Sequence, residues 1–222
     1  MQLHLFSSPG EPFLSDILEA ARSILAEQAD PVVAYLPAAN VQRHFIRETK
    51  TAFRALARVT AIKVEYDAMG KIRAALDRAS LLYIPGGNTY LLAHRLHTAG
   101  LLGEIRDRIL GGLPLVTFSA GTVFCGLDIL TTNDINCCGC TQFTGLGLVS
   151  VNFNVHYPPA GREDQGERDE RLEEYQAFHS TPVLALEDGA YLEVSNGAIR
   201  LVRGAMWRFE KGRPKAYITT ED

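Results

Sequence analysis

Short apolar runs alternate with segments of helical periodicity through the first half of the chain. Apolar runs bounded by Gly, Pro or polar residues are typical of buried strands, whereas apolar positions three and four residues apart indicate amphipathic helices. The pattern predicts strands at residues 3–6, 32–36, 59–64, 81–84 and 113–118. It predicts helices at residues 14–25, 40–57, 70–79, 89–98 and 101–110. We therefore expect a three-layer α/β fold, with a mostly parallel sheet covered by helices on both faces.

The last third of the chain has a different pattern. Short apolar runs follow one another closely, at residues 145–155, 182–186, 190–194, 198–202, 205–209 and 215–219. They are typical of antiparallel strands or hairpins, which we expect to be appended to the parallel sheet. A charged helix is expected between them at about 163–178. No repeat or linker divides the sequence, so residues 1–222 are predicted to form a single α/β domain.

Composition and charge exclude several function classes. The chain has 22 Lys and Arg against 26 Asp and Glu, a formal charge of −4, which argues against nucleic acid or an anionic membrane as the main partner. The longest uncharged stretches, 109–127 and 135–161, are interrupted by Gly, Pro, Asn or Thr, so no membrane span is expected. The first residues carry no basic leader followed by a long apolar stretch, and we expect a cytoplasmic protein. Homo-oligomerisation is left open.

The cysteines do not predict a metal site. Cys137 and Cys140 have C-x-x-C spacing, but zinc would require a second pair of ligands and none lies near them. Their surroundings are a loop rich in Thr, Asn and Gly, which is not the strand-to-helix setting of a thioredoxin-type pair. We therefore expect loop or core packing for the cysteines, and neither metal nor cofactor.

A serine follows the predicted strand 113–118 directly. Ser119 has small neighbours, Ala120 and Gly121, and a helical stretch is expected after them. This is the layout of a nucleophile elbow, in which a tight turn raises the hydroxyl above the sheet edge and the next backbone amide faces the developing oxyanion. Thr117 occupies the first Gly position of G-x-S-x-G, and a serine that merely caps a helix remains an alternative.

A second loop of the same kind follows the strand 81–84. Gly86 and Gly87 allow close approach of backbone amides to a ligand, and Gly87 could supply a second oxyanion donor. In a parallel sheet this loop and the Ser119 turn lie at the same edge, where open α/β sheets bind ligands. The alternative is that Asn88 or Thr89 simply caps the next helix.

A serine nucleophile needs a base, and one of the six histidines stands out. His156 ends the apolar run 145–155 and precedes a Pro-rich loop, a position that suits a catalytic histidine. Two aspartates could orient it. Asp134 lies in a polar turn after the elbow, and Asp188 follows the apolar run 182–186; either could instead be a turn-forming residue.

Five segments together resemble the serine peptidase family of dipeptidase E (α-aspartyl dipeptidase) and cyanophycinase. They are Gly86-Gly87-Asn88-Thr89, Ser119-Ala120-Gly121, Thr131-Thr132-Asn133-Asp134, Asn154-Val155-His156-Tyr157 and the GERDERL segment at residues 166–172. Their order and spacing fit dipeptidase E better than cyanophycinase. The likeness covers roughly residues 80–200, and five motifs in this order are more specific than any one of them.

This resemblance implies a fold like the class I glutamine amidotransferases, with Ser119 as nucleophile and His156 as general base. Family alignments point to Asp134 as the acid, whereas the structural triad of the family uses a Glu whose position falls on Asp188. We expect one aspartate to contact the imidazole and the other to support a loop. The backbone amides of Gly87 and Ala120 would form the oxyanion hole, and no metal is implied.

The resemblance also implies a small peptide substrate. Dipeptidase E cleaves dipeptides with an N-terminal Asp, so the side chains Asn88, Arg168 and Arg171 are the expected substrate-binding residues, with arginine as the partner of a carboxylate. The alternatives are a broader dipeptidase or carboxypeptidase, a cyanophycinase-like peptidase, another esterase or amidase, and a non-catalytic protein that binds a small ligand. A solvated helix with Glu–Arg pairs would equally explain much of the segment that carries the two arginines.

Overall fold

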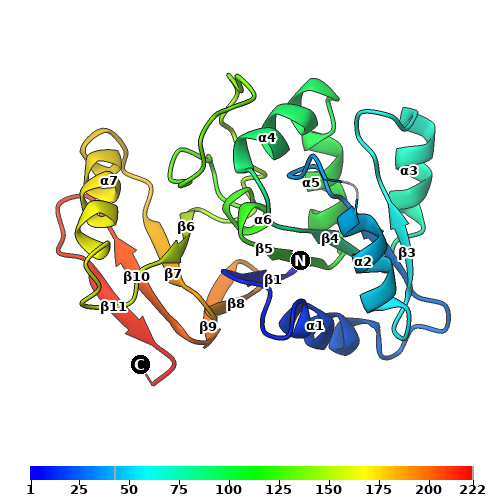
Figure 1. Ribbon diagram of the computed structural model, residues 1–222, viewed down its shortest axis with the longest axis horizontal. Coiled ribbons are helices and arrows are strands. Elements are labelled where there is room, and N and C mark those ends of the chain that lie inside the picture. Colours follow the sequence, from blue (N-terminus) through cyan, green and yellow to red (C-terminus); the bar gives the residue numbers. More distant parts are fainter. Residues whose placement is uncertain (43, 222) are drawn as a thin grey trace.

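The structure, a computed structural model, describes residues 1–42 and 44–221. Its larger sheet has seven strands in the order β3-β2-β4-β5-β1-β8-β9 (Figure 1). Strands β1 to β5 run parallel to one another, whereas β8 and β9 are antiparallel additions at one edge. The bounds are β1 Gln2–Phe6, β2 Val32–Tyr35, β3 Arg58–Ala61, β4 Leu81–Ile84, β5 Leu115–Phe118, β8 Tyr191–Ser195 and β9 Ala198–Arg203.

Helices cover both faces of this sheet. Helices α1 and α2 pack on one face in a cluster with Leu81 and Tyr83 of β4, and helices α3 to α5 pack on the other face with Leu82 and Ile84. Because successive side chains of a strand point to opposite faces, β4 is buried on both sides. The helix bounds are α1 Ser15–Leu25, α2 His44–Phe53, α3 Met69–Asp77, α4 Thr89–Thr98 and α5 Leu102–Leu110. The predicted three-layer α/β architecture is confirmed.

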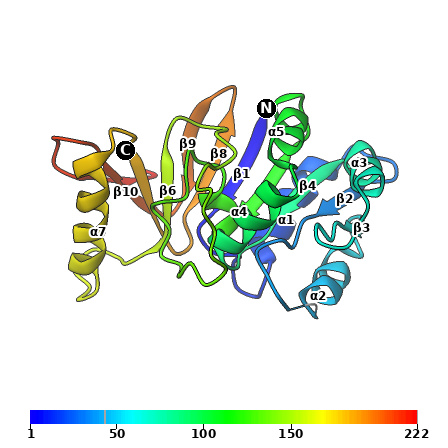
Figure 2. The ribbon, with the colours of Figure 1, turned by 90° about the horizontal axis from the view of Figure 1, so that it is seen from above.

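A second sheet lies beside the first, with strand order β11-β10-β7-β6 (Figures 1 and 2). Helix α7 packs on it through Leu172 and Tyr175. The bounds are β6 Asn152–Tyr157, α7 Gln165–Phe178, β7 Val183–Glu187, β10 Ala205–Phe209 and β11 Ala216–Thr219. The expectation of antiparallel pairing is wrong for β6 and β7, which run parallel. The physical reason is that α7 crosses between them, as a helix does in a βαβ unit.

The strand predicted at 145–155 is shorter than expected. β6 begins only at Asn152, and between α6 (Ala120–Val123) and β6 the described chain contains no helix or strand beyond an isolated bridge between Asp128 and Thr144. In the described chain the loop has no strand pairing with β6, and buried Asn side chains of β6 hydrogen-bond to its backbone instead. Asn152 accepts from the amide of Asp128 at 3.0 Å, and Asn154 donates to the carbonyl of Thr131 at 2.7 Å. The apolar residues at the end of the loop, 146–151, are buried in the main hydrophobic cluster, whereas Ile135 near its middle is exposed.

The two sheets share one hydrophobic core. A single cluster of buried residues includes Leu5 of β1, Leu186 of β7, Leu192 of β8 and Met206 of β10. This continuity favours the single-domain organisation over residues 1–222, which stays a prediction. Among the described residues, no helix combines the length and the apolar character that crossing a bilayer requires.

Candidate active site

Ser119 occupies a strained turn between β5 and the one-turn helix α6. Its backbone has φ 50° and ψ −117°, a left-handed conformation that is rare for a residue with a side chain. Its amide donates to the carbonyl of Phe6 at 3.0 Å, so the end of β1 holds the turn. A Cβ at Gly121 would lie 2.3 Å from the carbonyl oxygen of Ile84, and this close approach explains the glycine two residues after Ser119.

His156 reaches Ser119 from the second sheet. Its Nε2 lies 2.9 Å from the Ser119 hydroxyl oxygen. The histidine is the penultimate residue of β6, where the register with β7 is irregular, and its φ of 55° is again left-handed. The two residues are 37 positions apart, with a long loop between them, so only the tertiary fold brings them together.

Asp188 completes a hydrogen-bonded chain. Its Oδ1 lies 2.6 Å from Nδ1 of His156. Asp188 is on the turn from β7 to β8, in which the amide of Ala190 donates to the carbonyl of Glu187 and Gly189 adopts φ 84°. A carboxylate at Nδ1 favours the tautomer with hydrogen on that atom, which leaves Nε2 to accept from Ser119. The side chains of His156 and Asp188 are 43% and 67% exposed, so the site is open to solvent.

Asp134 has a different set of partners. Its Oδ2 accepts from the amide of Thr89 at 2.7 Å and from the hydroxyl of Thr132 at 3.1 Å. It therefore caps α4, and no contact joins it to His156 in the described chain. Its neighbour Asn133 donates to the carbonyl of Val155 at 3.0 Å. The Thr-Thr-Asn-Asp turn thus connects the start of α4 to the strand residue that precedes His156.

The loop after β4 lies beside the serine, since a Cβ at Gly86 would be 3.0 Å from the Cβ of Ser119. Gly87 has φ 139°, and a Cβ there would lie 2.4 Å from the carbonyl oxygen of Ala39, so the turn requires glycine. Neither the amide of Gly87 nor that of Ala120 donates to an acceptor within residues 1–42 and 44–221. Asn88 caps α4 through the amide of Leu91 and also donates to the carbonyl of Ile135 at 2.9 Å.

The two predicted arginines lie on the first turns of α7 and are not equivalent. Arg171 is exposed and pairs with Glu167 one turn earlier. Arg168 is half-buried, and its Nη1 is buried with no acceptor among the described residues. Burial and the neighbouring Arg171 lower the pKa of the Arg168 guanidinium. Among the residues that the structure describes, no contact joins either arginine to Ser119, His156 or Asp188.

Among the described residues, no three His, Cys, Asp or Glu side chains are grouped as metal ligands would be. Cys125 is buried behind the elbow, and burial raises the pKa of its thiol to about 12, which keeps it protonated and unreactive. Cys137 is exposed, whereas Cys140, its C-x-x-C partner, is buried.

Sequence reasoning missed two serines that hold the site. The hydroxyl of Ser7 accepts from the amide of His156 at 2.9 Å and donates to the carbonyl of Leu186 at 3.1 Å. The hydroxyl of Ser8 accepts from the amide of Gly189, next to Asp188, at 3.0 Å. Their position directly after the first predicted strand could have identified them, because polar residues that follow a parallel strand lie at the ligand-binding edge of the sheet.

Comparison with known proteins gives a consistent result. The profile of peptidase family S51 matches residues 3–202. A Drosophila melanogaster protein named "Probable alpha-aspartyl dipeptidase" is 44% identical over 124 residues, which cover 54% of this chain and 52% of that protein. The chain thus spans about half the length of this relative. Peptidase E of Haemophilus influenzae is 30% identical over 188 residues, which cover 83% of this chain and 86% of the relative.

A solved structure shares the fold. The crystal structure of a candidate peptidase E from Listeria monocytogenes EGD-e superposes with a TM-score of 0.74 at 20% sequence identity, covering 91% of this chain and 98% of that chain. At this identity the likeness concerns the fold alone. The family assignment comes from the sequence match over most of the chain: this protein belongs to peptidase family S51.

Proposed function

We propose that this protein is a serine exopeptidase that hydrolyses short peptides through an acyl-enzyme on Ser119. The observation that carries the proposal is the chain of two hydrogen bonds from Ser119 through His156 to Asp188, at 2.9 and 2.6 Å. A serine hydroxyl is a weak nucleophile unless a base accepts its proton, and a third group that orients the base completes the arrangement. The strained backbone of Ser119 supports the same role, because strain of this kind gathers at active sites.

In the proposed reaction, Nε2 of His156 takes the proton of Ser119 as its oxygen attacks the scissile carbonyl. Asp188 keeps the imidazole in the required orientation and stabilises the imidazolium that forms. The same Nε2 then protonates the leaving amine, and the C–N bond breaks to give the acyl-enzyme. Water, deprotonated by His156, attacks the acyl carbon and releases the acid product with the serine restored.

We assign the oxyanion hole to the amides of Gly87 and Ala120. Both come from turns at the carboxyl ends of neighbouring strands, β4 and β5, and neither has an intramolecular acceptor in the described chain. Ala120 also begins α6, although one turn of helix adds little dipole, so the amides themselves supply most of the stabilisation.

We assign Asp134 and Asn88 to holding the turn after β4 that carries Gly87, here called the oxyanion loop. Asp134 fixes the start of α4 directly after Gly87, and Asn88 links the same point to Ile135. One hydrogen of the Asn88 amide group remains for substrate. Asp188 is accordingly the proposed triad acid, although both aspartates are candidates from the sequence.

The proposed substrates are dipeptides with an N-terminal Asp. The name of the fly relative supports this class, and a cation that meets the substrate carboxylate is then required. Arg168 is the better candidate, because its buried Nη1 lacks an acceptor among the described residues while Arg171 is already paired with Glu167. Asp169 accepts from the Tyr157 hydroxyl, which ties the turn that carries Arg168 to the strand of His156.

We place this reaction in the cytoplasm. The support is the state of the cysteines, which are all free thiols although two of them, Cys137 and Cys138, reach the surface. Thiols persist in a reducing compartment, and an oxidising one favours disulfides.

The test is a panel of dipeptides and simple esters offered to the purified protein and to Ser119→Ala. We expect hydrolysis of Asp-Leu, covalent labelling by a fluorophosphonate, and loss of both in the variant with unchanged thermal stability. Hydrolysis of Ala-Leu as fast as Asp-Leu would indicate a broader dipeptidase. Labelling without any peptide cleavage would leave an esterase, and absence of both labelling and cleavage would refute the proposal in favour of a ligand-binding protein.

A further inference from the structure

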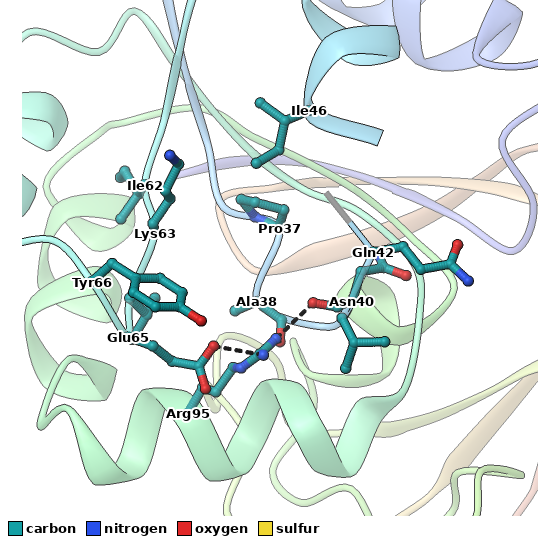
Figure 3. Close-up of a pocket in the computed structure, with 12 residues that line it drawn as sticks. Pro37, Ala38, Asn40, Gln42, Ile46, Ile62, Lys63, Glu65, Tyr66 and Arg95 are labelled. Atoms are coloured by element: carbon teal, nitrogen blue, oxygen red, sulfur yellow. Dashed lines mark hydrogen bonds and ion pairs between the residues drawn. The ribbon is translucent and has the colours of Figure 1, made fainter. Parts of the chain in front are cut away.

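Asn40 and Arg95, here called the polar clamp, contact the turn around Gly87 and the segment that follows β2. They line a pocket at the carboxyl ends of β2 and β3 (Figure 3). Nδ2 of Asn40 donates to the carbonyl oxygen of Gly86 at 2.6 Å. The preceding carbonyl, that of Ala39, accepts from the amide of Asn88 at 2.9 Å. The turn around Gly87 is therefore held from both sides by the segment that follows β2.

The bond from Asn40 has a direct consequence for the amide of Gly87. The carbonyl of Gly86 and the N–H of Gly87 belong to one peptide unit, which is planar, and in the trans form the two groups point in opposite directions. Fixing the carbonyl therefore fixes the direction of the N–H. A hydrogen bond to the carbonyl also polarises the peptide unit, which makes its N–H a stronger donor.

Asn40 is itself held by Arg95 of α4. Nη1 of Arg95 donates to the carbonyls of Ala38 at 2.9 Å and of Asn40 at 2.7 Å. Its Nη2 lies 2.6 Å from a carboxylate oxygen of Glu65, and its side chain is only 12% exposed. Figure 3 shows the guanidinium between Glu65 and the backbone of residues 38–40. A guanidinium holds its N–H donors in one rigid plane, whereas the three donors of an ammonium group rotate on a flexible side chain.

We propose, on the basis of the acyl transfer proposed above, that Asn40, held by Arg95, is a positioning residue that aims the Gly87 amide at the oxyanion. Neither side chain touches the triad. They act through the Gly86–Gly87 peptide unit, and their effect is on the transition state, where the carbonyl oxygen of the substrate acquires charge.

The decisive experiment compares Asn40→Ala and Asn40→Asp with Gln42→Ala as the control. Gln42 is an exposed side chain of the same segment. Asn40→Ala should lower kcat on Asp-Leu about 10-fold and leave KM within about 2-fold, because only transition-state stabilisation is lost. Asn40→Asp is nearly isosteric but places a carboxylate against the Gly86 carbonyl, so it should be slower than Asn40→Ala. Gln42→Ala should match the wild type.

Two further readouts separate this proposal from the peptidase assignment. The rate of fluorophosphonate labelling of Ser119 should fall in the order wild type, Asn40→Ala, Asn40→Asp, whether or not a dipeptide is cleaved. The ¹H–¹⁵N signal of the Gly87 amide should shift in both Asn40 variants and stay in place in Gln42→Ala, even in a protein without activity. Wild-type labelling rates, an unmoved Gly87 signal, or a change confined to KM would overturn the positioning role.

Arg95 variants test the outer part of the clamp. Arg95→Lys keeps the charge but not the three-way geometry, and Arg95→Met keeps most of the side-chain length without charge. We expect the loss of kcat to be larger for Met than for Lys, and the Gly87 signal to move in both. A fall in thermal stability with kcat and the Gly87 signal unchanged would assign Arg95 to stability alone and overturn its part in positioning.

Discussion

The amide of His156 donates a hydrogen bond to the hydroxyl of Ser7, 2.9 Å away, although the two residues are 149 positions apart in the chain. Ser7 is fully buried and donates in turn to the carbonyl of Leu186. One hydroxyl at the end of β1 thus connects the strand that carries His156 with the strand that precedes Asp188. Because His156 has a left-handed backbone, this bond helps to hold a conformation that the residue would not adopt by itself.

Replacing Ser7 by Ala should therefore impair both stability and catalysis. The variant removes the partner of the His156 amide and of the buried Leu186 carbonyl, at a cost of about 1–3 kcal/mol. The melting temperature should fall by about 5 °C. We expect kcat to fall about 10-fold, since small displacements of a catalytic group are costly. Ser23→Ala, on the exposed face of α1, is the matched control and should change neither. A stable Ser7→Ala with full activity would show that His156 holds its position without this bond.

The two candidate acids should separate in their effects. Asp188 is 67% exposed and contacts the imidazole, so Asp188→Asn should lower kcat about 100-fold with a melting temperature within about 1 °C of the wild type. Asp134 caps α4, so Asp134→Ala should cost about 1 kcal/mol of stability as a lost cap.

The distinguishing measurements for these variants are the rate of fluorophosphonate labelling of Ser119 and thermal unfolding. Labelling depends on the oriented imidazole that accepts the serine proton, so we expect it to slow far more in Asp188→Asn than in Asp134→Ala. Slower labelling in Asp134→Ala than in Asp188→Asn would contradict the assignment drawn from the geometry.

Backbone strain at Ser119 predicts an unusual order of stabilities. At φ 50° and ψ −117° any residue with a Cβ is strained, whereas glycine adopts this conformation freely. Ser119→Gly should therefore be more stable than Ser119→Ala by about 1 kcal/mol. At Ser23 inside α1 the order should be reversed, because glycine is the poorer helix former. Urea unfolding of the four variants measures both differences, and the same order at both positions would argue against strain at the elbow.

Local pattern accounts for the strand ends that build the site. The strand before Ser119, the glycines at 86 and 87 and the histidine before a Pro-rich loop were all visible as breaks in an apolar run, because a parallel strand must end where its ligand-binding loop begins. The parallel pairing of β6 and β7 was not visible, since it depends on where α7 packs rather than on the composition of either strand.

The choice between Asp134 and Asp188 shows more clearly what the sequence pattern cannot predict. Both are aspartates in polar turns after apolar segments, so residue type and spacing treat them alike. What separates them is that Asp188 is on the turn between the two sheets, beside the end of β6, while Asp134 lies over the start of α4. Ser7 and Asn40 are a similar case, because their partners are 149 and 46 positions away in the sequence.

The preference for an acidic N-terminal residue should depend on Arg168. Arg168→Ala should lower the ratio of kcat/KM for Asp-Leu to that for Ala-Leu by about 10-fold or more, because a charge-assisted bond to the substrate is lost. Arg171→Ala is the natural control, since its guanidinium is exposed and already paired with Glu167, and its ratio should stay within about 2-fold. Equal effects of the two variants, or none, would remove the arginine segment from substrate recognition.

Stability should depend on pH through His4, which lies in β1 of the larger sheet, whereas His156 lies in β6 of the second sheet. His4 is buried, and its Nδ1 lies beside the hydroxyl of Tyr191, which donates to Glu193. Its Nε2 lies beside the side-chain amide nitrogen of Gln2. Burial lowers the pKa of His4 below its ordinary value of 6.5, an effect that the charge of Glu193 only partly opposes.

The sign of this effect follows from proton binding in the two states. Just below pH 6.5 the unfolded chain takes up a proton at His4 and the folded protein does not, so the free energy of unfolding falls as the pH decreases through this window. The raised pKa of Tyr191 and the lowered pKa of Glu193 place both of those groups outside it. Urea unfolding between pH 7.5 and pH 5 should show a smaller loss of stability in His4→Gln than in the wild type, and His94→Gln, at an exposed position of α4, should retain the wild-type slope. If His4→Gln lost stability as steeply as the wild type, the buried imidazole would not be the source of the pH dependence.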